Sequence, residues 1–310
     1  MTNKQHQLTV QAAVSPKFRG RKVIKSRSVP HYPETAEREF KRVTNGYIRL
    51  LKNSLMEHLP AIMDEYRREQ RNDSRLDASR NLEDKVRQEL QKVAEELEQK
   101  LAAFGLDGLV QKIAKLTKTN SLREWKRVCK DTLGIDLMDD YYNGDFYEEA
   151  LHRWVDENIN KIKGIPNETL GSMREIILDG FKKGRTVTDI SKKIQQAYGV
   201  TRRKAQALAR DQVGSLNAQI SKLQQKDAGC TKYRWSSSKD SRVRHCHRAL
   251  DGKIFDWDDP PEMWYETKSG RVYTGRHCHP GEDYLCRCVA IPVFDYDTVN
   301  VPMQKSDKKG

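Results

Sequence analysis

Cysteine and histidine, the side chains best suited to metal binding or nucleophilic chemistry, are concentrated in the last third of the chain. Five of the six cysteines and four of the eight histidines lie between positions 230 and 288. The first residues, MTNKQHQLTV, lack the apolar centre of a signal peptide, so we expect the chain to mature in a reducing cytoplasm. There, clustered cysteine and histidine more often bind metal than form disulfides. The cluster therefore predicts a metal centre, and its thiolate and imidazole groups favour a structural zinc.

The spacing of the cluster indicates which residues could share one ion. Cys286 and Cys288 form a C-x-C pair, and in an extended strand both side chains point to the same face. Two His-Cys-His triplets precede the pair, at 245–247 and at 277–279, and a Pro280-Gly281 turn separates the nearer one from it. The candidates outnumber the four places of a tetrahedral site, so the residues alone leave the ligand set open. For Cys129 and Cys230 we expect no metal role.

Catalytic uses of the same residues are less well supported by the sequence. A cysteine nucleophile needs a histidine, a third orienting group and one activated thiol, and nothing distinguishes one thiol here. Asp240, Arg242 and Arg244 could bind phosphate, although a structural network of these charges is the favoured interpretation. The chain contains no Walker loop, dinucleotide fingerprint or Gly-x-Ser-x-Gly elbow. We therefore expect no enzyme, with a metal-dependent nuclease or DNA-processing protein as the alternative.

Positive charge is placed unevenly along the chain. The net charge is +13, and residues 1–33 contain no Asp or Glu. This stretch predicts a disordered basic arm that binds nucleic acid or an acidic partner, with a simple solvated tail as the alternative. We also expect no membrane span, because no apolar run is long enough to cross a bilayer. The candidate contacts of the arm are Lys17, Arg19, Arg21, Lys22, Lys25 and Arg27.

Residues 34–165 are predicted to form an α-helical domain. Apolar side chains recur at steps of three and four from Ala36 to Leu55, and again from Leu82 to Phe104. Pro60 should kink or interrupt the first of these helices. Ser121 and Glu124 form a capping-box pattern that should open a short helix closed by Gly134. A further helix is expected over 145–162, ending before Gly164 and Pro166.

Residues 166–297 are predicted to be helical up to 225 and rich in short strands afterwards. The helical part should be broken at Gly184 and at 198–201, which gives the outline of a helix-turn-helix; a plain helical hairpin is the favoured interpretation. Strands are expected at 232–235, 253–255, 271–273 and 286–293. The predicted fold class is α+β: a mostly α-helical body followed by a small β-rich Cys/His module at 226–297. Residues 298–310 are expected to form a disordered tail.

Motif residues of this last region occur in a fixed order. A helix with Ala209-Arg210 and Asn217 precedes a Tyr-x-Trp at 233–235 and an Asp-x-Arg-Val-Arg at 240–244. A Leu-x-Gly at 250–252 and a His-Pro before Cys-Arg-Cys complete the series. In this order of residues, the segment from about 166 to 293 resembles the phage Mu F-type minor head proteins, the phage head morphogenesis domain family.

The resemblance implies a minor capsid protein of a tailed bacteriophage, associated with the portal, packaged inside the procapsid and acting in head assembly or DNA delivery. It implies no catalytic activity. The implied partners are the portal protein, a scaffold or major capsid protein, and phage DNA bound without sequence preference; the implied location is the virion, and the host cytoplasm during assembly. On matching positions, the implied zinc ligands are His247, His279, Cys286 and Cys288. The neighbouring alternates are His245, Cys246, His277 and Cys278.

Overall fold

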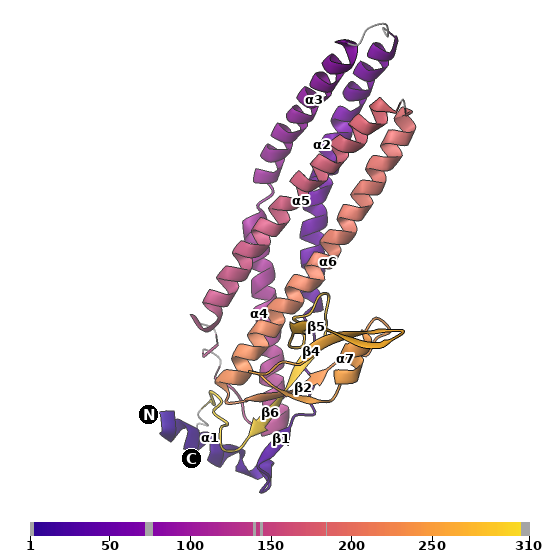
Figure 1. Ribbon diagram of the computed structural model, residues 1–310. Coiled ribbons are helices and arrows are strands. Elements are labelled where there is room, and N and C mark those ends of the chain that lie inside the picture. Colours follow the sequence, from indigo (N-terminus) through magenta and orange to yellow (C-terminus); the bar gives the residue numbers. More distant parts are fainter. Residues whose placement is uncertain (1–2, 72–76, 139–140, 143–144, 184, 305–310) are drawn as a thin grey trace. The chain divides into compact units, whose positions relative to one another are not determined.

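The computed structural model describes residues 3–71, 77–138, 141–142, 145–183 and 185–304. The fold class is α+β, as predicted: long helices dominate and the β-strands are concentrated towards the carboxyl end (Figure 1). The described chain forms two compact units that interleave in sequence. Unit 1 contains residues 1–37, 113–154 and 210–310, and unit 2 contains residues 38–112 and 155–209. The predicted boundary at 165/166 therefore does not separate the two units.

Unit 2 is built from helix segments that share one apolar core. The helices are α2 (Glu34–Arg71), α3 (Asp77–Ala102), α4 (Leu106–Leu133), α5 (Glu148–Lys182) and α6 (Val187–Asp227), and several of them continue into unit 1. Leu55, Val93, Met173 and Ile190 are among the side chains that meet in this core, each from a different helix. Burial of such apolar stripes supplies most of the stability of a helix in a folded protein.

At three places where the sequence predicts a helix to be interrupted, the helix is continuous for the same physical reason. Helix α2 runs through Pro60, and α5 runs through Gly164 and Pro166. Helix α6 continues through 198–201, which removes the helix-turn-helix outline. In each case buried side chains on both sides of the weak position keep the helix in place, such as Leu59 and Ile62 around Pro60. Helix α5 ends at Lys182 and α6 begins at Val187; Gly184, where a break was predicted, lies outside the described residues.

The capping-box pattern at Ser121 and Glu124 does not mark a helix start. Both residues lie inside α4, which begins fifteen residues earlier at Leu106. Their side chains are buried and serve tertiary contacts instead: the Ser121 hydroxyl donates to Gln224 Oε1 at 3.3 Å, and Glu124 accepts from Arg127 at 2.8 Å. Tertiary packing, and not the local pattern of residue types, determines what these two side chains do.

Residues 3–33 are not a disordered arm, and residues 1–2 lie outside the described part of the chain. Helix α1 (Asn3–Phe18) buries Val10, Val14 and Phe18, which recur at every fourth position on one face. Strand β1 (Val23–Lys25) then pairs antiparallel with β6 (Val289–Asp295). The Phe18 ring packs edge-on against Tyr296 at 5.2 Å between centroids. The sequence did not reveal this helix because only three apolar side chains form its buried face and the rest of the segment is mostly polar.

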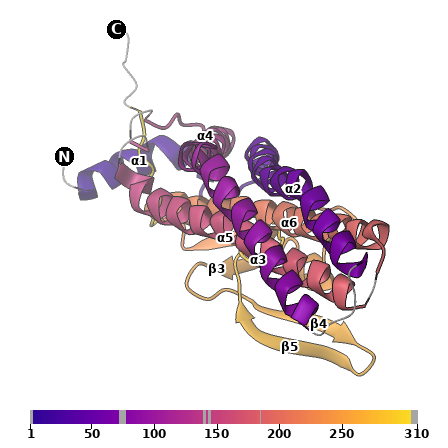
Figure 2. The same cartoon turned by 90° about the horizontal axis from the view of Figure 1, so that it is seen from above.

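Unit 1 contains a four-stranded antiparallel sheet in the order β1-β6-β2-β3, with β2 at Lys232–Ser236 and β3 at Ile254–Asp256. Strands β4 (Glu262–Thr267) and β5 (Gly270–His277) form a separate hairpin (Figure 2). The four predicted strand regions are close to β2, β3, β5 and β6, whereas β1 and β4 were not predicted. Helix α7 (His245–Leu250) lies between β2 and β3 in the sequence.

The expected disordered tail is wrong for residues 298–304, and residues 305–310 lie outside the described part of the chain. Val299 and Val301 are fully buried, and Met303 forms a bridge with Leu137. The chain passes so close to Gly229 that a Cβ there would lie 1.8 Å from the Thr298 carbonyl oxygen. Only glycine, which also tolerates the φ of +78° at this position, allows that approach.

Candidate metal centre

Two segments distant in sequence bring a histidine and two cysteines together in unit 1. Helix α7 supplies His247, and the turn before β6 supplies Cys286 and Cys288. The ligand atoms of all three lie within 4.8 Å of one another. His247 Nδ1 lies 3.5 Å from Cys286 Sγ and 3.6 Å from Cys288 Sγ. A single ion could therefore bind one imidazole nitrogen and two sulfurs, and two thiolates with an imidazole are ligands that suit zinc.

The C-x-C pair does not lie in a strand as expected, because β6 begins only at Val289. The turn that carries the pair is tight: Gly281 has a φ of +92° and Leu285 a φ of +55°. It aims two backbone N–H groups, from Gly281 and from Cys288, at Cys286 Sγ, each at 3.4 Å. These N–H groups stabilise a thiolate at this position.

The protonation of the three groups is coupled. A hydrogen bond from Cys288 lowers the pKa of Cys286 well below its usual range, with a further contribution from His247. The same hydrogen bond and burial raise the pKa of Cys288. Burial opposes the charged imidazolium, but hydrogen bonds with Asp283 and Cys286 raise the pKa of His247 to about 9. These shifts favour a Cys286 thiolate beside a protonated His247, and an ion held by the three residues would have to replace the protons on Cys288 and His247 Nδ1.

Asp283 orients His247 and was missed by the sequence reasoning. Its Oδ2 accepts from His247 Nε2 at 3.0 Å, which directs Nδ1 towards the two sulfurs. Burial works to raise the pKa of Asp283, but the hydrogen bond from His247 and the charge of Arg244 lower it to about 2. Carboxylates commonly hold metal-binding histidines in this way. An acidic residue three positions before Cys286 was the available signal.

The Asp-x-Arg-Val-Arg motif and the Cys-Arg-Cys motif interlock around the site. Asp240 accepts hydrogen bonds from Arg242 and from Arg287, the residue between the two cysteines. Arg244 donates to Asp283 Oδ2 at 2.8 Å. The favoured interpretation of these charges as a structural network is therefore what the structure shows, and the network positions both halves of the site.

The other predicted ligands lie elsewhere. His279 is buried, with Nδ1 3.0 Å from the Tyr233 hydroxyl and Nε2 accepting from Lys222 at 3.1 Å. His245 contacts Glu266 at 2.8 Å, and His277 donates to the Pro260 carbonyl at 2.9 Å. Cys246 and Cys278 pack in the apolar cluster that also contains Cys286 and Cys288. Within the described part of the chain, the three-residue group is the set whose ligand atoms converge.

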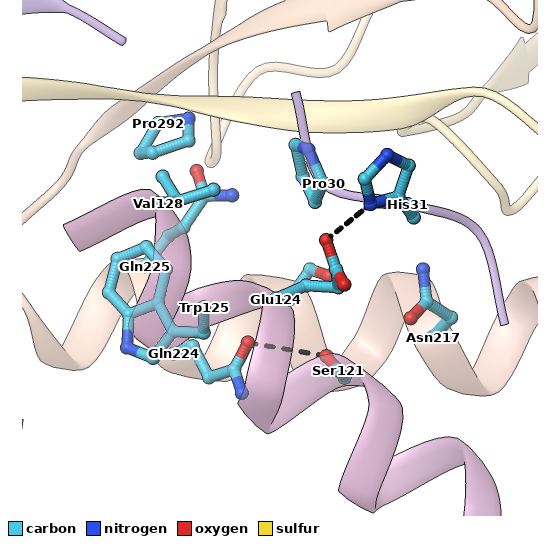
Figure 3. A pocket seen from close by; sticks show the side chains of 11 residues that line it. Pro30, His31, Ser121, Glu124, Trp125, Val128, Asn217, Gln224, Gln225 and Pro292 are labelled. Atoms are coloured by element: carbon cyan, nitrogen blue, oxygen red, sulfur yellow. Dashed lines mark hydrogen bonds and ion pairs between the residues drawn. The ribbon is translucent and has the colours of Figure 1, made fainter. Parts of the chain in front are cut away.

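A second polar site in unit 1 surrounds Glu124 (Figure 3). Its carboxylate is 5% exposed and accepts from His31 Nδ1 at 2.8 Å and from Arg127 at 2.8 Å. Burial opposes ionisation, but these hydrogen bonds lower the pKa of Glu124. A carboxylate so fully engaged by donors is an anchor: it fastens the segment that leads from β1 to α2 onto helix α4.

The predicted basic contacts are distributed over the surface of unit 1. Lys17, Arg21, Lys25 and Arg27 line one open hollow. Lys22 instead forms an ion pair with Asp297 at 2.8 Å. Arg19 is exposed and is not among the residues that line the hollow.

One protein family matches a part of this chain. Residues 172–291 match the family described as "Phage Mu protein F like protein". The matched segment includes α7, the three-residue group and Asp283, and it confirms the predicted resemblance for this part of the chain. At the level of the family, the match supports a phage head morphogenesis protein.

Two curated proteins are also similar. An uncharacterized protein of Haemophilus influenzae is 33% identical over 166 residues, which are 54% of this chain and 34% of that protein. The NAD(+)--arginine ADP-ribosyltransferase EFV of Enterococcus faecalis is 28% identical over 123 residues, which are 38% of this chain and 25% of that protein. The chain thus matches about a third or less of the length of these relatives. No solved structure matches. Among the described residues, no helix is long and apolar enough to cross a membrane.

Proposed function

We propose that the protein is a minor head protein of a tailed bacteriophage, associated with the portal and packaged inside the procapsid, where it acts in head assembly or DNA delivery. The observation that supports this most is the Mu F match, because it covers the motifs that interlock around His247 and the cysteine pair. The proposed partners are the portal protein, a scaffold or major capsid protein, and phage DNA.

The test uses heads purified from the phage that encodes the chain. Mass spectrometry of DNA-filled heads is expected to detect the protein at low copy number relative to the major capsid protein. A phage lacking the gene should produce defective or non-infectious heads, and co-expression with portal should retain the protein on portal rings. Absence of the protein from purified heads would contradict the proposal.

We further propose that His247, Cys286 and Cys288 bind zinc in a structural role. All three are at most 4% exposed, so an ion between them would be enclosed by protein and out of reach of a large substrate. Zinc would link α7 to the start of β6 and thereby close the module. Structural zinc contributes on the order of 10 kcal/mol or more to small domains, so a bound ion would supply a large part of the stability of this module.

A metal-dependent nuclease is the second candidate, because a donor set of three residues leaves one position of a tetrahedral ion open, as in catalytic zinc sites. Incubation with duplex and single-stranded DNA and divalent metal distinguishes the two roles. Reproducible cleavage that His247→Ala abolishes would favour the nuclease. We propose no enzyme, and no ADP-ribosyl transfer, since only 25% of the Enterococcus faecalis transferase is matched.

A further inference from the structure

A hollow at the surface of unit 1 is lined by four cations from one short stretch of chain. Lys17 lies at the end of α1, Lys25 ends β1, and Arg21 and Arg27 lie on either side of that strand. All four side chains are exposed. We call this feature the basic hollow.

The cations of the basic hollow are held in place by the fold. Helix α1 is fixed by its buried face and β1 by pairing with β6, so the backbone at both ends of the stretch is ordered. The Lys17 side chain lies over Gly134, where a Cβ would be 2.6 Å from Lys17 Cε. Arg21 donates its Nε–H to the Phe18 carbonyl at 3.2 Å, which fixes the direction of its guanidinium.

The charge of the hollow is strongly unbalanced. Asp131 is the single acidic residue among its lining residues, and it accepts from the Ser28 hydroxyl at 2.8 Å and contacts Arg127 at 3.5 Å. Within the described part of the chain, Lys17, Lys25 and Arg27 form no ion pair. Four cations against one already engaged carboxylate attract an anion with several charges.

We propose that the basic hollow binds the phosphate backbone of duplex DNA. Two guanidinium groups offer paired N–H donors that match phosphate oxygens, and the two lysine ammonium groups add charged donors of the kind that contact DNA backbones. Contacts to phosphate oxygens carry no sequence information, so the proposed binding is independent of sequence. The inference rests on the proposed contact with DNA and makes it specific, replacing a flexible arm by a fixed surface.

The test compares two double variants of the full-length protein that remove the same charge from residues 1–33. The variant Lys25→Ala with Arg27→Ala removes two of the four cations of the basic hollow. The control variant, Lys4→Ala with Arg19→Ala, removes two exposed cations outside it. DNA affinity is measured on a short duplex between 50 and 200 mM salt. Because each phosphate contact contributes about 0.9 to the slope of log K against log salt, the first variant should flatten the slope by about 1.8 and the control by much less.

If both variants flatten the salt dependence equally, the basic hollow is not the DNA-binding surface, although the protein still binds DNA. Wild-type protein that binds polyglutamate but not DNA would overturn it in favour of an acidic protein partner. Neither result bears on the presence of the protein in phage heads, so failure of this inference and failure of the proposed function are distinguishable. Circular dichroism and thermal unfolding confirm that both variants are folded.

Discussion

Replacing Asp283 by Asn tests how the metal centre is organised. The Asp283 carboxylate accepts four hydrogen bonds: from His247 Nε2 at 3.0 Å, from Arg244 and Arg276 at 2.8 Å, and from the Tyr284 N–H at 2.9 Å. An Asn side chain has one acceptor oxygen and one NH₂ group, which cannot accept a hydrogen bond. If the Asn oxygen keeps the hydrogen bonds from Arg276 and Tyr284, its NH₂ group faces the N–H donors of Arg244 and His247. Those two hydrogen bonds are then lost, because two donors cannot bond to each other.

We expect Asp283→Asn to bind the metal more weakly although His247, Cys286 and Cys288 are all still present. Loss of the residue that orients a metal-binding histidine typically lowers affinity 10- to 100-fold. This range corresponds to about 1.4 to 2.7 kcal/mol of binding free energy. The metal-free variant should also be less stable by about 1–3 kcal/mol, because buried donors lose their partner.

The assay is a competition titration of zinc between the full-length protein and a chelator, with cobalt substitution to report the thiolate ligands by absorption. Asp258→Asn is the matched control, since Asp258 is an exposed carboxylate in unit 1 that pairs only with Lys226 among the described residues, at 2.5 Å. Asp258→Asn should bind zinc like the wild type. A folded Asp283→Asn protein with wild-type zinc affinity would refute the role given to this carboxylate.

Three further predictions concern the ligands, the pH dependence and the amino-terminal segment. Cys288→Ser should lose the bound metal and its stabilisation against heat, as measured by elemental analysis and thermal unfolding, whereas Cys129→Ala should keep the metal; loss in both would contradict the assignment. In the metal-free protein the pKa of His247 is about 9 against an ordinary value of 6.5, so the stabilisation from its charged form is complete below pH 6.5 and disappears as the pH rises through about 9. Urea unfolding of His247→Gln should therefore show a flatter profile across that window, and an unchanged profile would disprove this origin. Phe18→Ala should lower the free energy of unfolding by about 3–5 kcal/mol, because a buried ring is removed from a packed core, and the exposed Leu8→Ala should change it little; equal effects would contradict an ordered α1.

The sequence predicted the fold class and the region of the site because both depend on local patterns. Apolar periodicity identified the long helices, and the spacing of Cys286 and Cys288 identified two of the three converging ligands. His247 could be distinguished from its neighbour His245 only through the resemblance, since nothing in the spacing separates two histidines two positions apart.

The features that the sequence did not predict depend on tertiary contacts. Pro60 and Pro166 stop isolated helices, but burial of neighbouring apolar side chains keeps α2 and α5 continuous. The apolar stripe of α1 is only three residues long and becomes visible once the surface that covers it is known. His279 lies seven residues before Cys286, yet its imidazole is held by the Tyr233 hydroxyl and the Lys222 ammonium instead of joining the three converging ligands.

Metal content combined with X-ray absorption of the protein as purified tests the central claim most directly. The account predicts one zinc ion per chain, with two sulfur ligands from Cys286 and Cys288 and nitrogen from His247. Freshly purified protein that contains no bound metal, or a bound zinc whose ligand shell contains no sulfur, would contradict it.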